Sequence, residues 1–333
     1  MNTLVKNAAL VPFNLLYKVS PKLCLQLLFR IKQGYSLDLE RPRTLSEKIQ
    51  WIKLNDRSPL MPCCADKFAV RSYVEERGCG RYLNELIWHG NDPADIPFDD
   101  LPGKFVIKVT HGSTFNYLQD GSTPVDKREI IRLCRRWLKT DFLPCYGEWF
   151  YGRGGGIAPS IVVERYLDAD SPIGLVDYKV FVMNGHARFV MVASDRAAGA
   201  RYDGSHHDDF YDTDWKLMSV SKKKYPNSST GIERPACLRE LLSVAERLAE
   251  PFNLARVDFY VAGGGGFPAP CLRGDHVHAG VGLRCIRQLR VGCAAGRHAP
   301  SALRPVCAAR ATPADMQGCA RWTTSRKVRS SPP

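Results

Sequence analysis

The clearest candidate for phosphate chemistry is Lys108, which lies inside the apolar strand-like segment of residues 105–109. Small residues follow it, at positions 110–113. A lysine that points from a strand toward such a loop can meet phosphate oxygens, and the N–H groups of the loop add further donors. Taken alone, the segment fits equally well a solvated lysine at a strand edge.

Glu164 follows three β-branched residues in the strand-like segment of residues 161–166. A strand that leaves a core in this way presents one polar side chain and free backbone groups, which can hold a heterocycle such as adenine. The competing interpretation is an exposed glutamate at a strand end.

Charged residues also gather around an expected β-hairpin. Asp177 and Lys179 open it, Asn184-Gly185 supplies a turn that tolerates positive φ angles, and Arg196 lies just beyond its second strand. Arg196 is suited to bind a phosphate or carboxylate through two parallel hydrogen bonds.

Asp258 lies in an apolar segment in which Arg256 and Tyr260 share its side of the expected strand. A carboxylate in this position is a hard oxygen ligand of the kind that Mg²⁺ prefers. Each of these signals is weak when it is taken singly.

The elements that must position these groups alternate irregularly between helices and strands. A capping box at residues 44–47 predicts a helix start, and apolar spacing predicts further helices near residues 66–78, 127–140 and 235–250. Strands are expected at residues 105–109, 161–166, 178–183, 187–192 and 256–261. This order predicts an α+β fold and disfavours a regular βαβ repeat.

The net charge of +13 does not indicate a nucleic-acid partner. Residues 263–333 hold eleven basic and two acidic residues, so the first 262 residues carry only about +4. The twelve cysteines include no Cys-x-x-Cys pair, which argues against a zinc or redox motif and fits reduced thiols in the cytoplasm.

The N-terminal residues 4–31 are rich in apolar side chains, but Lys6, Lys18 and Lys22 interrupt them. No uninterrupted apolar run approaches the roughly 20 residues that a membrane span needs. The favoured interpretation is a set of helices packed on the body of the protein, and the alternative is a peripheral membrane anchor.

Taken in order, these segments resemble the TupA-like ATP-grasp family, which is associated with teichuronopeptide and capsule-like polysaccharide synthesis. The resemblance spans roughly residues 40–262 and rests on eight segments: TLSEKIQW (44–51), ADKFAVR (65–71), FVIKVTHGS (105–113), DYKVF (177–181), SDR (194–196), FYDTDW (210–215), YPN (225–227) and RVDFY (256–260).

The resemblance implies an ATP-grasp-like fold in which two α+β lobes with antiparallel sheets enclose a nucleotide site. An α-rich region would occupy residues 1–100, the first lobe and hinge 101–166, and the second lobe 167–262. ATP and Mg²⁺ are the implied cofactors. The implied nucleotide-binding residues are Lys108, Ser113, Glu164, Arg165, Tyr166, Leu167 and Lys179, with Asp258 as the magnesium ligand.

The implied activity is an ATP- and Mg²⁺-dependent ligation of an amine to a carboxylate, such as a uronic acid or an acidic peptide, through an acyl-phosphate. His111, Arg196 and Arg201 are the candidates for holding the substrate or the transferred phosphate. The expected location is the cytoplasm, with peripheral association with membrane-bound polysaccharide assembly proteins. The alternative is a glycosyltransferase-type protein that modifies glycans, or a catalytically silent scaffold that binds nucleotide or glycan.

Two departures from the family pattern stand out. Residues 114–116 (TFN) replace the further glycine that the family usually has after His-Gly-Ser. No glutamate follows Glu250, so the expected second metal carboxylate is missing, and the chain is expected to be impaired, binding ATP with little turnover. The composition of residues 263–333, without Glu, Asn or Tyr, predicts a segment read out of frame after a run of glycines. Its alternatives are a disordered basic tail and a small metal module that uses Asp275, His276 and His278.

Overall fold

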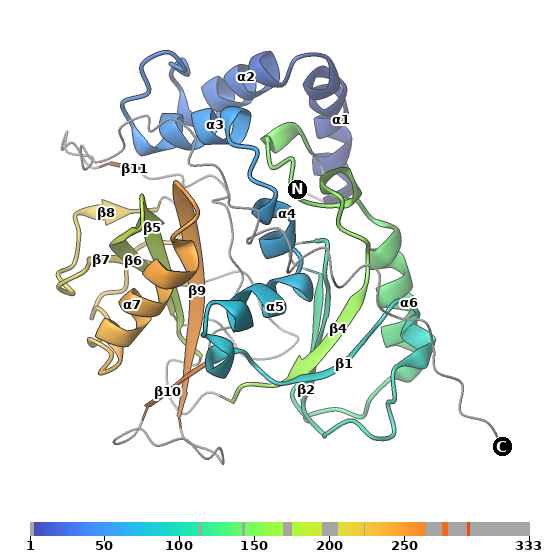
Figure 1. The fold of residues 1–333 in the computed structure, drawn as a ribbon. Coiled ribbons are helices and arrows are strands. Elements are labelled where there is room, and N and C mark those ends of the chain that lie inside the picture. Colours follow the sequence, from blue (N-terminus) through green and yellow to red (C-terminus); the bar gives the residue numbers. More distant parts are fainter. Residues whose placement is uncertain are drawn as a thin grey trace.

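The computed structural model describes residues 3–112, 115–141, 144–168, 175–194, 206–222, 224–263, 275–278 and 292–293. The chain opens with helices, of which α1, α2 and α3 lie along one edge of the molecule while α4 and α5 lie closer to its centre (Figure 1). Their bounds are α1 Thr3–Val19, α2 Pro21–Gln33, α3 Leu45–Asn55, α4 Leu60–Ala65 and α5 Ala69–Glu76. Among the helices of these ranges, none is both long and apolar enough to cross a bilayer.

The predicted capping box forms at the start of α3. The Thr44 hydroxyl accepts a hydrogen bond from the Glu47 N–H at 3.2 Å, and a Glu47 carboxylate oxygen accepts one from the Thr44 N–H at 2.8 Å. Two N–H groups that the helix leaves unpaired are thereby satisfied, which fixes where the helix begins.

The first sheet has four antiparallel strands in the order β1-β4-β2-β3. Their bounds are β1 Leu86–Gly90, β2 Phe105–Val109, β3 Asn116–Gln119 and β4 Ile161–Arg165. Helix α6 (Lys127–Lys139) packs on this sheet through Ile130 and Cys134, which share a core with Phe105 and Ile107. Short 3₁₀ turns lie at Gly80–Tyr82, Pro93–Asp95, Pro144–Tyr146 and Arg153–Gly155.

The second sheet has five antiparallel strands in the order β10-β9-β5-β6-β7. Their bounds are β5 Asp177–Met183, β6 His186–Ser194, β7 His207–Asp212, β9 Leu254–Gly263 and β10 Asp275–His278; the short strands β8 Val220–Ser221 and β11 Gly292–Cys293 pair with each other. At the turn between β5 and β6, Asn184 and Gly185 have φ angles of 52° and 77°, as predicted for the hairpin.

The two faces of the second sheet differ in character. One face is apolar and packs on α4, α5 and α7 (Leu238–Ala249), through residues such as Val180, Val192 and Phe259. On the other face, α3 covers only the apolar part, where Ile49 meets Phe181. Beyond that cover the same face carries charged residues, which define the candidate site.

The sequence did not predict strands β1, β3 or β7. Strand β1 lies within residues 1–100 and joins the first sheet. Most of residues 263–333 lie outside the described part of the chain. Of the proposed metal module, Asp275, His276 and His278 belong to β10.

Candidate nucleotide and substrate site

In the first sheet, Lys108 and Glu164 come from neighbouring strands and form an ion pair. The Lys108 ammonium donates to Glu164 Oε2 at 2.6 Å, and an Arg71 nitrogen lies 3.9 Å from Glu164 Oε1. Burial alone would raise the pKa of Glu164, but the two cations outweigh it and lower the pKa. Glu164 is therefore an ionised, buried carboxylate, and not the exposed strand-end residue of the competing interpretation.

Backbone groups of the hinge after Glu164 already make hydrogen bonds within the protein. The Arg165 N–H donates to the Glu85 carbonyl, and the Asn84 amide donates to the Arg165 carbonyl. The Arg165 side chain is exposed and pairs with the Glu85 carboxylate at 2.8 Å. Tyr166 and Leu167, which follow the strand end, are both half-buried.

Lys67 was not assigned a role from the sequence, although its segment was quoted for the family resemblance. Its ammonium donates to the Val109 carbonyl at 2.8 Å and to the Gly112 carbonyl at 2.5 Å, so it braces the loop that follows β2. Arg71, on α5, donates to the Asn84 carbonyl at 2.7 Å. Since Tyr73 of the same helix bonds to the Leu248 carbonyl of α7, this segment links the two sheets.

His111, expected to hold substrate or phosphate, is completely buried. Its Nε2 lies 2.9 Å from the Thr140 carbonyl, and desolvation lowers the pKa of the ring. A neutral imidazole packed in this way supports the loop after β2, and contact with a substrate would require the ring to leave its position. The other loop candidate, Ser113, lies outside the described residues, as do Arg196 and Arg201.

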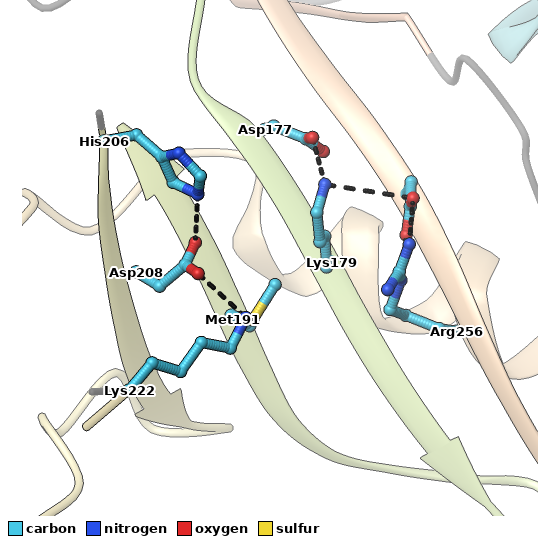
Figure 2. Close-up of polar contacts among 8 residues, drawn as sticks. Asp177, Lys179, Met191, His206, Asp208, Lys222 and Arg256 are labelled. Atoms are coloured by element: carbon cyan, nitrogen blue, oxygen red, sulfur yellow. Dashed lines mark hydrogen bonds and ion pairs between the residues drawn. The ribbon is translucent and has the colours of Figure 1, made fainter. Parts of the chain in front are cut away.

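The second sheet carries four buried charges on adjacent strands (Figure 2). Lys179 on β5 pairs with Asp177 and lies 3.8 Å from an Asp258 oxygen on β9. Arg256 donates to both Asp258 oxygens, at 2.6 and 2.7 Å. Two cations and two anions balance each other, which is the condition for burying charges at moderate cost.

A second charged group on the same face was not predicted. Asp208 on β7 lies 3.3 Å from His206 Nε2 and accepts from the Lys222 ammonium at 2.8 Å. Burial alone would raise the pKa of Asp208, but His206 and Lys222 outweigh it and lower the pKa. The Lys222 ammonium also lies 3.0 Å from the sulfur of Met191, the cross-strand neighbour of Lys179.

The register explains why these residues meet. Asp177 on β5 pairs with Ala193 on β6, which pairs with Asp208 on β7. Asp258 on β9 pairs with Lys179 on β5, which pairs with Met191 on β6. Directly paired residues point to the same face of a sheet. Alternation within β5 and β9 supplies a sequence signal for this face, but strand pairing was needed to align Asp208 with Asp177.

A family model for TupA-like ATPgrasp proteins matches residues 47–266. The chain belongs to the TupA-like ATP-grasp family. The match takes in Lys108, Glu164, Lys179 and Asp258, which confirms the resemblance inferred from the sequence. The predicted α+β fold with two antiparallel sheets and a helical N-terminal region is also confirmed.

Solved structures with some similarity are ATP-grasp enzymes at low identity. The ATP-grasp ligase PsnB, complexed with a phosphomimetic variant of its minimal precursor, Mg and ADP, is 14% identical, with 73% of this chain and 58% of that chain covered and a TM-score of 0.39. D-alanine–D-alanine ligase from Bacillus anthracis, complexed with ATP, is 17% identical, with coverages of 60% and 51% and a TM-score of 0.33. The chain spans under two thirds of these proteins. Among curated proteins, no sequence matches the chain.

Proposed function

We propose that the chain is an ATP-dependent ligase that joins an amine to a carboxylate during the synthesis of bacterial surface polysaccharide. The observation that carries this proposal is the pair of cationic strand residues, Lys108 and Lys179, one on each antiparallel sheet of an ATP-grasp chain. Each ammonium is held by a carboxylate, so each is fixed in place before a nucleotide arrives. A side chain that is already held in position loses little conformational entropy on binding, which favours binding of the ATP phosphates.

In the proposed reaction, an oxygen of the substrate carboxylate attacks the γ-phosphorus of ATP, and ADP leaves. The acyl-phosphate that results is attacked by the amine, a C–N bond forms, and inorganic phosphate leaves while a base takes the amine proton. Lys179 and Arg256 supply positive charge on the face of the second sheet. Lys222, whose ammonium lies beside Met191 of β6 and Asp208 of β7, would bind the substrate carboxylate. The adenine would lie against the hinge at Tyr166 and Leu167.

The residues of the second sheet fit a magnesium ion. Asp177 and Asp258 both lie next to the Lys179 ammonium, so one cation between β5 and β9 can reach both carboxylates. Lys179 and Arg256 balance these charges in this structure, so both would have to turn toward phosphate for Mg²⁺ to bind. Mg²⁺ is often held by one or two carboxylates together with substrate phosphates. Asp258 and Asp177 would hold the ion, which would neutralise phosphate charge. Asp177 would thus serve as the second metal-binding carboxylate, since the glutamate expected from the family pattern is missing.

The proposed site of action is the cytoplasm, beside membrane-bound polysaccharide assembly proteins, with a small acidic or glycan compound as substrate.

The experiment is a titration of Mg–ATP into the protein by calorimetry, followed by trapping with hydroxylamine in the presence of D-glucuronate or L-glutamate. Binding of ATP and formation of a hydroxamate are expected, since hydroxylamine captures acyl-phosphates. The Lys179→Met variant should bind ATP at least tenfold more weakly. If the wild-type protein does not bind ATP, the proposed function is wrong.

A catalytically silent nucleotide- or glycan-binding scaffold is the second candidate. It is favoured by the Arg256 guanidinium, which engages both Asp258 oxygens, and by the absence of any glutamate after Glu250. ATP binding without hydroxamate formation from any carboxylate would support the scaffold.

A further inference from the structure

Helices α1 and α2 each expose a stripe of large apolar side chains. Every stripe member follows the previous one by four residues, so the members of one helix lie on one side of it. On α1 the stripe is Val11, Leu15 and Val19, which are 53%, 61% and 85% exposed; on α2 it is Leu23, Leu27 and Ile31, which are 45%, 41% and 69% exposed.

The opposite sides of these helices already pack on the body of the protein. Cys24 and Leu28 of α2 are buried against Cys145, and Leu10 and Phe13 of α1 join the same cluster. The exposed stripes therefore are not needed for the core. Large apolar side chains exposed in a row on a protein surface often mark an interaction site.

The charge of this region is one-sided. Residues 1–37 contain five basic residues and no acidic residue. Lys18 follows Val11 by seven residues and Arg30 follows Leu23 by seven, so both exposed cations lie beside the stripes. Basic residues that flank an apolar helix face favour contact with a negatively charged lipid surface.

We propose that α1 and α2 form a docking surface for an anionic lipid bilayer, with the six stripe residues entering the headgroup region and Lys18 and Arg30 contacting lipid phosphates. The helices pack against each other, and Figure 1 shows both at one edge of the molecule, on the far side of α3 from the second sheet. A bilayer at this edge would lie against α1 and α2.

Charge argues for lipid over a second copy of this chain. Two copies that met through this surface would bring five basic residues against five, with no acidic partner in the segment. Like charges brought together across an interface are unfavourable. An anionic bilayer removes this repulsion and covers the apolar stripes at the same time.

The test is co-sedimentation of the full chain with vesicles of phosphatidylcholine alone or mixed with phosphatidylglycerol at three to one. The wild-type protein should sediment with the anionic vesicles, and binding should weaken with salt. The double variant Val19→Glu/Ile31→Glu should lose at least about tenfold in apparent partition coefficient, because two apolar contacts become anionic. Removing Lys18 or Arg30 should cost about fivefold each.

Leu217→Glu is the matched control, because Leu217 is 55% exposed but lies between β7 and β8, away from α1 and α2. It should sediment like the wild-type protein, and all variants should keep the wild-type melting temperature and ATP affinity. The proposal is overturned if the wild-type protein stays in solution with anionic vesicles, or if Val19→Glu/Ile31→Glu sediments equally well. It is also overturned if the stripes instead mediate a dimer that this double variant dissociates.

Discussion

Replacing Glu164 by glutamine tests the electrostatic account of the first sheet. The substitution keeps the size of the side chain and removes the charge that faces Lys108 at 2.6 Å and Arg71 at 3.9 Å. Because the Glu164 side chain is only 9% exposed, water cannot replace the lost carboxylate. Both cations then face a neutral amide.

The size of the expected loss in the free energy of unfolding depends on how deeply Glu164 and Lys108 are buried. Removing one member of a fully buried ion pair costs about 3–5 kcal/mol, because the other charge is left uncompensated. Lys108 is 28% exposed and can turn toward water. We therefore expect the free energy of unfolding to fall by about 2 kcal/mol.

The assay is urea denaturation of the wild-type protein and Glu164→Gln at several pH values between 3.5 and 7, with tryptophan fluorescence as the readout. The pKa of Glu164 is lowered in the folded protein, so its contribution to stability is complete above the unfolded value of about 4.3 and is lost as pH falls through the folded value. The difference between the two proteins should thus be largest at neutral pH and shrink in acid.

The control is Glu85→Gln, which breaks the exposed pair with Arg165 and should cost at most about 0.5 kcal/mol. The double variant Lys108→Met/Glu164→Gln should recover part of the loss, since Lys108 no longer remains uncompensated. A Glu164→Gln protein as stable as the wild type at pH 7, or a difference that grows in acid, would refute the reasoning.

Three further outcomes are expected. Asp258→Asn should weaken binding of Mg–ATP by tenfold or more in calorimetry and leave metal-free ATP binding less affected, whereas equal weakening of both would argue against a metal role. Thr44→Ala should lower the free energy of unfolding by about 1 kcal/mol, because the capping box of α3 loses its hydroxyl. Gly185→Ala should cost about 1–2 kcal/mol, because its φ of 77° strains a residue with a Cβ; an unchanged denaturation midpoint would contradict that account.

Local chemistry decided which elements could be predicted. The Asn-Gly turn, the capping box and the long amphipathic helices carry signals within a few residues of each other, and all of them appear in the structure. Strands β1, β3 and β7 were missed. Strand β3 has only four residues, and β7 has the polar sequence His-Asp-Asp-Phe-Tyr-Asp, which has no periodicity typical of a strand.

The sequence by itself determined the family, the α+β order of elements and the charged residues at strand positions, because each of these depends on residue type and local spacing. Only the tertiary structure decided which charges meet. Glu164 reaches Lys108 across a strand pair, Lys179 lies between Asp177 and Asp258, and Lys222 returns to Asp208. These contacts depend on strand register and on residues up to 79 positions apart, as 179 and 258 are, and no local sequence pattern specifies which distant residues will meet.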